Sequence, residues 1–204
     1  MKLYHLTSGL LGVNSYFLVN EQNQALLIDG GESYKTILKA QTDLNIKLTA
    51  LLLTHSHFDH AGNACKLQAD GVKVYVSELD APKLSNSLNL ASDFGRQFDS
   101  LIPDFTFKNG DELIINDIKI KVISTPGHTD GSVTFLVDDM LFTGDTLFRL
   151  SVGRTDFPTG DRKMLSNSIK TLFNLQGEYR VFPGHGEFTT LDYERKYNTL
   201  VDYD

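Results

Sequence analysis

The sequence predicts an α/β protein made of two similar halves. Short apolar runs that fit buried strands, such as Ala25–Ile28, alternate with segments of helical periodicity. The order strand, Asp29, helix, strand, His55 in the first half matches strand, Asp145, helix, strand, His185 in the second. Polar residues follow several of these strands directly, and loops at strand ends commonly form sites. We therefore expect a layered structure with a site where the strand ends converge.

Composition limits the class of protein. The chain of 204 residues is 41% hydrophobic, which is enough for one packed domain, expected over residues 1–204. It carries 19 basic and 26 acidic residues without a basic stripe, which argues against a nucleic-acid partner. A lone cysteine, Cys65, is compatible with a reducing cytoplasm, and we expect it to be a small buried residue. We find no signal peptide or membrane span, so we expect a cytoplasmic protein.

The sequence of the first half predicts five strands with helices between some of them. The strands are Leu3–Leu6, Val13–Asn20, Ala25–Ile28, Thr49–Leu53 and Val72–Val76, with a hairpin tip at Asn23-Gln24. Ser33 is a candidate N-cap for a helix whose inward residues are Tyr34, Ile37, Leu38 and Leu44. Further helices are expected over Gly62–Ala69 and from the capping-box pattern Ser77-Glu78-Leu79-Asp80.

The second half repeats this alternation after an irregular segment. Residues Asn86–Asp104 are polar and mixed, and we expect a mobile flap or a helical insert over the site. Hairpins follow at Asp111–Ile115 with Ile118–Ile123, across Asn116-Asp117, and at Val133–Val137 with Met140–Thr143. A loop leads to a helix capped by Asp161, then to the strand Tyr179–Phe182 and a short helix after Thr190.

The densest polar cluster is the stretch Thr54-His55-Ser56-His57-Phe58-Asp59-His60, which contains three of the six histidines. Such clustering adds polarity and crowding without a packing gain, and bound metal supplies the compensating free energy. Downstream, His128 and His185 each follow a Pro-Gly pair, and Asp145 follows a glycine at a strand end. Ordinary polar loops would rarely agree in this way on both residue type and position, so we interpret the set as a metal centre.

The spacing divides these side chains between two ions. His55 and His57 are two residues apart, so from an extended loop they point the same way. We assign them with His128 to a first ion, Asp59, His60 and His185 to a second, and Asp145 to a bridge between the two. Two divalent ions about 3.5–4 Å apart would lower the pKa of a shared water toward about 7 and supply a hydroxide nucleophile. Hydrolysis is the simplest chemistry of such a centre, with zinc the first choice and iron or manganese compatible.

Other polar residues have structural interpretations. His5 lies in a strand without a partner motif, and we expect a structural role. Asp29 is expected to support the metal loop by hydrogen bonding rather than to bind metal. Tyr16 and Phe148 lie near the site, and core packing is the default expectation for both.

The motif His55-Ser56-His57-Phe58-Asp59-His60, followed by His128, Asp145 and His185, resembles that of the metallo-β-lactamase-fold hydrolases over nearly the whole chain. The resemblance implies a four-layer αββα sandwich with metals at one edge between the sheets, and catalytic roles for Asp59 and Asp145. His60 in the last motif position is the hydrolase form, which makes antibiotic hydrolysis an unfavoured activity.

Within that superfamily, Gly144-Asp145-Thr146-Leu147-Phe148 and Pro183-Gly184-His185 look like the glyoxalase II group. That group hydrolyses S-acyl-glutathione thioesters such as S-D-lactoylglutathione, and the resemblance implies that Arg154 contacts substrate. Asp156 stands where the family often has tyrosine. We expect no C-terminal glutathione-binding helical domain, as in short bacterial glyoxalase II-like proteins with a similar Gly153-Arg154-Thr155-Asp156 loop.

Three alternatives remain open beside a small-molecule thioester substrate. Persulfide dioxygenases share the fold and motif and use one iron, which here would be held by His55, His128 and Asp145. A lactone or phosphoester hydrolase could use the same centre. A metal-binding scaffold without turnover is the least favoured, because every ligand position is filled. The sequence does not determine the oligomeric state.

Overall fold

Two six-stranded sheets form the centre of the molecule. The computed structural model describes residues 1–9, 11–31 and 33–201. The first sheet has the order β1 (Lys2–Ser8), β2 (Val13–Val19), β3 (Gln24–Ile28), β4 (Lys47–Leu52), β5 (Lys73–Ser77) and β6 (Phe105–Phe107). The second has the order β14 (Thr189–Thr190), β13 (Arg180–Pro183), β10 (Met140–Gly144), β9 (Val133–Val137), β8 (Ile118–Ser124) and β7 (Glu112–Ile115).

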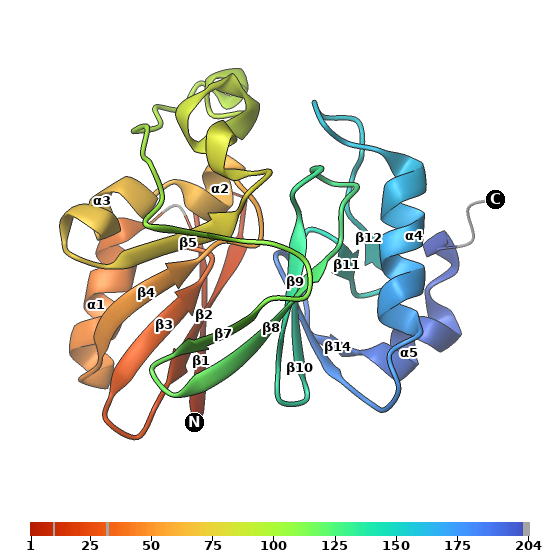
Figure 1. Cartoon of the computed structure of the whole chain (residues 1–204), viewed down its shortest axis with the longest axis horizontal. Coiled ribbons are helices and arrows are strands. Elements are labelled where there is room, and N and C mark those ends of the chain that lie inside the picture. Colours follow the sequence, from red (N-terminus) through yellow and green to blue (C-terminus); the bar gives the residue numbers. More distant parts are fainter. Residues whose placement is uncertain (10, 32, 202–204) are drawn as a thin grey trace.

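Helices cover the outer face of each sheet (Figure 1). The first sheet is covered by α1 (Tyr34–Leu44), α2 (Phe58–Ala61) and α3 (Ala64–Ala69), and the second by α4 (Arg162–Phe173) and α5 (Leu191–Tyr197). The remaining elements are short: η1 (Ala81–Ser85), η2 (Ser87–Asn89), η3 (Ser92–Phe94), η4 (Thr199–Val201) and the hairpin of β11 (Leu147–Phe148) with β12 (Ser151–Val152). The predicted four-layer αββα sandwich is confirmed.

The alternation of side chains along the strands explains the three layers of core. On β2, Tyr16 and Leu18 pack between the two sheets, whereas Phe17 and Val19 face the helices α1 and α3. A third cluster joins the second sheet to α4 and α5. Because both faces of these strands are buried, they are apolar runs rather than half-polar alternations, as the sequence predicts for Ala25–Ile28.

The predicted similarity of the two halves is confirmed in the strand pairing. In the first half β3 leads through Asp29 and α1 to β4, and β3 and β4 are parallel. In the second half β10 leads through Asp145 and α4 to β13, which is again a parallel pair. Both crossovers bring strand ends to the same edge, where the histidine-bearing loops meet.

Several local predictions hold. Ser33 and Asp161 cap α1 and α4, accepting hydrogen bonds from the backbone N–H groups of Thr36 and Met164. Asn116 and Asp117 both have positive φ, which is the backbone of a tight two-residue hairpin turn between β7 and β8.

Other local predictions are wrong. The capping-box pattern does not begin an α-helix, since β5 continues to Ser77 and only the 3₁₀ turn η1 follows. The Ser77 hydroxyl does accept from the backbone N–H of Asp80, but the Asp80 carboxylate accepts from the distant Ser56 and Thr129 instead of completing the capping box. The helix expected over Gly62–Ala69 begins two residues later, as α3, and a separate helix that was not expected, α2, precedes it. Asn63 lies between the two helices, and its side-chain amide donates to the carbonyls of Gly30 and Gly31. Leu38, expected to face inward, is exposed on α1.

Candidate metal centre

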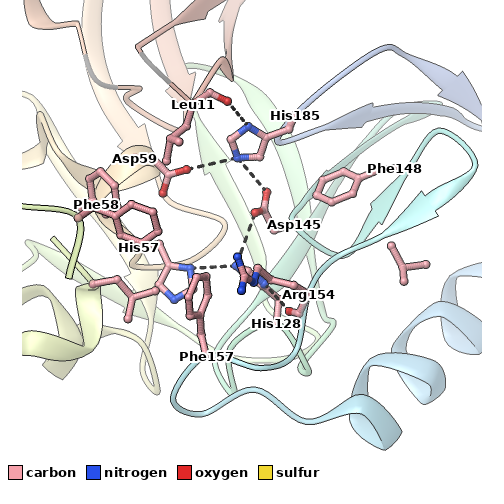
Figure 2. Close-up of a pocket in the computed structure, with 13 residues that line it drawn as sticks. Leu11, His57, Phe58, Asp59, His128, Asp145, Phe148, Arg154, Phe157 and His185 are labelled. Carbon is pink, nitrogen blue, oxygen red and sulfur yellow. Dashed lines mark hydrogen bonds and ion pairs between the residues drawn. The ribbon is translucent and has the colours of Figure 1, made fainter.

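The seven candidate ligands come from four strand ends and meet at one point. The loop after β4 carries His55 and His57, and α2 carries Asp59 and His60. The turn after β8 presents His128, and the ends of β10 and β13 present Asp145 and His185. Figure 2 shows His57, Asp59, His128, Asp145 and His185 turned toward a common space. Three groups have donor atoms within 4.8 Å of one another: His55 with His57 and His128, His55 with His60 and Asp145, and Asp59 with His60 and His185.

Backbone carbonyls fix the tautomers of two of these histidines. His128 Nδ1 lies 2.8 Å from the carbonyl oxygen of Arg154, and His185 Nδ1 lies 3.0 Å from that of Leu11. A carbonyl oxygen only accepts, so each Nδ1 carries the proton and each Nε2 presents a lone pair to the site. This is the arrangement that a metal-binding imidazole needs.

Asp29 orients a third imidazole and the loop that carries the motif. Its carboxylate accepts from His60 Nδ1 at 2.8 Å, and from the backbone N–H and hydroxyl of Thr54 at 2.9 and 2.8 Å. The Thr54 hydroxyl lies 3.1 Å from His55 Nδ1, so both imidazoles direct Nε2 inward. The expectation that Asp29 supports the loop by hydrogen bonding is confirmed.

The donor set fits two divalent ions. His55 Nε2 and Asp145 Oδ1 are buried polar atoms without a hydrogen-bond partner among the described residues. His57 Nδ1 lies 2.9 Å from His128 Nε2, and His60 Nε2 lies 3.3 Å from His185 Nε2. Imidazole nitrogens directed at one another in a buried space leave polar groups poorly satisfied, and cations between them would satisfy all of them at once.

Asp145 lies between the group of His55, His57 and His128 and the group of Asp59, His60 and His185, as its predicted bridging role requires. Its Oδ1 is 3.3 Å from His60 Nε2 and 3.6 Å from His185 Nε2. Its Oδ2 is 3.5 Å from His128 Nε2. The two oxygens of one carboxylate therefore face opposite groups. Gly184 makes this approach possible, because a Cβ there would clash with Asp145 Oδ1 and the His60 ring.

The imidazole pKa values shift downward at His55 and His57 but upward at His60. Burial, together with the neighbouring imidazoles, lowers the pKa of His57 to about 3 and that of His55 well below its usual value. Burial also opposes the charged form of His60, but the nearby carboxylates of Asp29, Asp59 and Asp145 outweigh it and raise the His60 pKa. In the protein without metal, His55 and His57 are therefore neutral and ready to coordinate, whereas an ion must displace a proton from His60.

Asp80 is a buried residue that the sequence analysis did not connect with the site. Its carboxylate accepts from the backbone N–H of Ser56 at 2.8 Å and from the hydroxyl of Thr129 at 3.1 Å. Ser56 lies between His55 and His57, and Thr129 follows His128. Asp80 thus joins the two loops that carry the His55, His57 and His128 imidazoles. The partners are 24 and 49 residues away in sequence, so no local pattern reveals them.

The charge of Asp80 is balanced by Lys83, which is only 3% exposed. The Lys83 ammonium contacts both Asp80 and the half-exposed Asp130. Gly131 leaves room for this network, since a Cβ there would clash with Asp80 Oδ1. A buried lysine is unusual, and here two carboxylates surround it.

A cavity of about 380 Å³ opens onto the centre. It is lined by Leu11, His57, Phe58, Asp59, Leu90, Phe94, His128, Asp145, Phe148, Val152, Arg154, Phe157 and His185. The default expectation that Phe148 belongs to the core is wrong, because its ring lies 6.2 Å from that of His185 and borders the cavity. Tyr16 is a core residue as expected.

The segment expected as a flap or helical insert consists of short turns that contribute to the cavity. Its 3₁₀ turns η2 and η3 place Leu90 and Phe94 in the lining. Arg154, expected to contact substrate, also lines the cavity, with its guanidinium bonded to Asp156. His5 lies outside the three groups and bonds to the Asn14 side chain at 2.8 Å.

The model of the metallo-β-lactamase superfamily matches residues 8–185. This chain belongs to the metallo-β-lactamase superfamily. A probable metallo-hydrolase of Streptococcus pyogenes is 37% identical, over 97% of this chain and 89% of that protein. The hydroxyacylglutathione hydrolase GloC of Haemophilus influenzae is 36% identical, over 90% of this chain and 89% of that one. The predicted membership of the superfamily and its short glyoxalase II-like group is confirmed.

Solved structures of the superfamily superpose closely on this chain. BLEG-1, described as a B3 metallo-β-lactamase, gives a TM-score of 0.93 at 31% identity and covers 99% of this chain and 100% of its own. TTHA1623 in a di-iron-bound form gives 0.87 at 35% identity, covering 97% and 99%. No helix within the described ranges is both long and apolar enough to cross a bilayer.

Proposed function

We propose that this chain is a metal-dependent hydrolase that cleaves thioesters at a centre of two divalent ions. The observation that carries this proposal is Asp145, whose two oxygens face two groups of imidazoles beside an open cavity. The di-iron form of TTHA1623 and the hydroxyacylglutathione hydrolase GloC support the two-ion centre and the thioester, respectively.

Two bound ions would lower the pKa of a water toward about 7 and polarise the substrate carbonyl. The side chains of the candidate ligands would position the two ions. His55, His57 and His128 would bind one ion and Asp59, His60 and His185 the other, with Asp145 shared. Zinc, iron and manganese all suit this mixture of imidazole and carboxylate.

Asp59 and Asp145 are the carboxylates nearest the reacting space. Asp59 Oδ2 lies 3.3 Å from His185 Nε2, so it and the imidazole approach the same point. Burial opposes the charged form of both carboxyls, but the neighbouring imidazoles outweigh it and hold their pKa values low. Both therefore remain ionised throughout the neutral range and would bind cations there, while backbone carbonyls hold the His128 and His185 rings in position.

Three of the alternatives fit this site less well than a thioester hydrolase. A dioxygenase with one iron would leave the group of Asp59, His60 and His185 without a role, although its donor atoms converge as closely as those of the first group. The net charge of −7 disfavours a nucleic-acid phosphoester. A non-catalytic scaffold would not need an open cavity beside the metal groups.

The test is hydrolysis by the metal-replete protein of thioesters including S-D-lactoylglutathione, with a β-lactam and a lactone assayed alongside. A kcat/KM of about 10⁴ M⁻¹s⁻¹ or above for a thioester would support the proposal. Faster turnover of the β-lactam or the lactone would refute the substrate class. Oxygen uptake with glutathione persulfide would refute hydrolysis.

A further inference from the structure

Outside the candidate ligands, the cavity wall is apolar except for Arg154, and half of its residues are phenylalanines. Three phenylalanines line the cavity on the side where His57 lies. Phe58 comes from α2, Phe94 from η3 and Phe157 from the loop before α4. Ring centroids are 5.2 Å apart for Phe58 and Phe94, 6.2 Å for Phe94 and Phe157, and 5.9 Å for Phe157 and His57. We call Phe58, Phe94 and Phe157 the phenylalanine wall. Figure 2 shows Phe58 and Phe157 beside His57, with Phe148 on the far side of Asp145.

The phenylalanine wall is open to a ligand at Phe94, whereas Phe58 is buried. The side chain of Phe94 is 44% exposed, although it stands next to two other rings and to the cavity. A large apolar side chain that remains partly exposed at the mouth of a concave site offers area that a ligand can cover. Aromatic rings at these spacings also favour another ring placed edge-on or offset against them.

The positive charge of Arg154, which lines the cavity, is paired with a carboxylate. Among the described lining residues other than histidine, Arg154 alone is basic. Its Nε and one terminal nitrogen donate to the two carboxylate oxygens of Asp156 at 2.7 and 2.6 Å. The guanidinium also lies 3.9 Å from the centroid of the Phe157 ring. The Arg154–Asp156 pair is therefore neutral overall, and it extends the phenylalanine wall as a flat stacked surface.

We propose that the substrate of this site is an uncharged thioester with an aryl or alkyl group packed on the phenylalanine wall, rather than a thioester of a thiol that carries carboxylates. This inference rests on the proposed function, because it assumes that the bond cleaved is a thioester. The apolar group belongs to the acyl or to the thiol side, and either gives the same contact. A carboxylate near Arg154 would meet Asp156 as well, and the charge of Asp156 would offset much of its attraction to Arg154.

A matched set of four substrates tests the proposal on the metal-replete protein. The reference is S-acetyl-N-acetylcysteamine, which is small and uncharged. S-phenylacetyl-N-acetylcysteamine places a ring on the acyl side, S-benzyl thioacetate places it on the thiol side, and S-acetylglutathione adds carboxylates. We expect kcat/KM at least about tenfold above the reference for one of the two aryl substrates, and within about threefold of it for S-acetylglutathione. A preference for S-acetylglutathione over both aryl substrates would overturn the proposal.

Variants separate the wall from general effects. Phe94→Ala should lower the ratio of aryl to reference kcat/KM by about twofold to tenfold. Phe105→Ala removes a similarly exposed phenylalanine on β6, outside the cavity lining, and should leave the ratio unchanged. Equal effects of the two variants would overturn the proposal. Asp156→Asn leaves Arg154 unpaired and should raise kcat/KM for S-acetylglutathione about threefold or more; no rise would refute the role given to Asp156.

A binding measurement distinguishes this inference from the proposed function. N-acetyl-S-benzylcysteamine is an uncharged thioether without a thioester bond, and its affinity is measured by calorimetry with S-methylglutathione as the comparison. If no thioester is hydrolysed, the proposed function fails. Tighter binding of the benzyl thioether that Phe94→Ala weakens would still support the phenylalanine wall as a site for apolar groups. Tighter binding of S-methylglutathione would overturn it.

Discussion

Substitution of Asp80 by asparagine tests how the first group of imidazoles is held. Asp80 is fully buried and accepts from Ser56 and Thr129, and its charge balances Lys83. Asparagine keeps the shape and one acceptor oxygen but removes the charge. Breaking a buried ion pair from one side costs about 3–5 kcal/mol. We expect the lower value, about 3 kcal/mol, because Asp130 still contacts Lys83, although it is 44% exposed at its side chain.

The double-mutant cycle with Lys83→Met gives the sharper result. Methionine has a similar length and no charge, so Asp80→Asn with Lys83→Met leaves no unpaired buried ion. We expect the double variant to be more stable than the sum of the single effects predicts, by about 1–3 kcal/mol. The assay is urea denaturation of metal-free protein, which removes the contribution of bound ions. Additivity within about 0.5 kcal/mol would refute the coupling.

The same variant has a consequence for metal binding. Asp80 lies outside the candidate ligands but fixes the backbone beside His55, His57 and His128. Loss of such support commonly lowers metal affinity by about 10–100-fold. We therefore expect Asp80→Asn to lower the affinity for one of the two ions, measured by competition with a chelator. Unchanged affinity for both ions would contradict the positioning role.

Three further predictions concern other parts of the chain. Asp145→Asn should lose at least one ion by elemental analysis and lower kcat/KM by several orders of magnitude, and full activity would contradict the bridge. Asp104 bonds to Gln68 and Lys73, and these bonds, against the effect of burial, lower its pKa to about 2. Its stabilisation should be present above pH 4 and lost as the pH falls through 2, so Asp104→Asn should cost about 1 kcal/mol at pH 7, allowing for solvent screening, and almost nothing near pH 2. Nearby carboxylates raise the pKa of His60, whereas burial lowers the pKa of His55 and His57, so protons compete with metal for His60 at a higher pH. The ion held by Asp59, His60 and His185 should therefore leave first as the pH is lowered, and simultaneous loss of both ions would contradict this order.

Patterns within a few residues predicted much of the fold and the candidate site. Apolar runs gave the buried strands, Ser33 and Asp161 gave helix starts, and the spacing from His55 to His60 predicted a metal centre whose residues do converge. These predictions succeed because each depends on backbone periodicity or on side chains near one another in sequence.

What the sequence did not reveal depends on distant contacts. Asp80 reads as a helix-capping residue until Ser56 and Thr129 are known to be its neighbours. Phe94 lies in an irregular segment, and only the folded chain places it between Phe58 and Phe157. Tertiary contacts of this kind override local propensity, so the sequence did not reveal that Asp80 supports the metal centre or that Phe94 lines its cavity.

The most direct test of the central claim is a metal titration of thioester hydrolysis. Metal-free protein is loaded stepwise with zinc, iron or manganese, and bound metal and kcat/KM are measured on the same samples. The account predicts that activity rises to its maximum as the bound metal reaches two ions per chain, and that Asp145→Asn does not reach this maximum. Full thioester hydrolysis with one ion per chain, or without any metal, would contradict it.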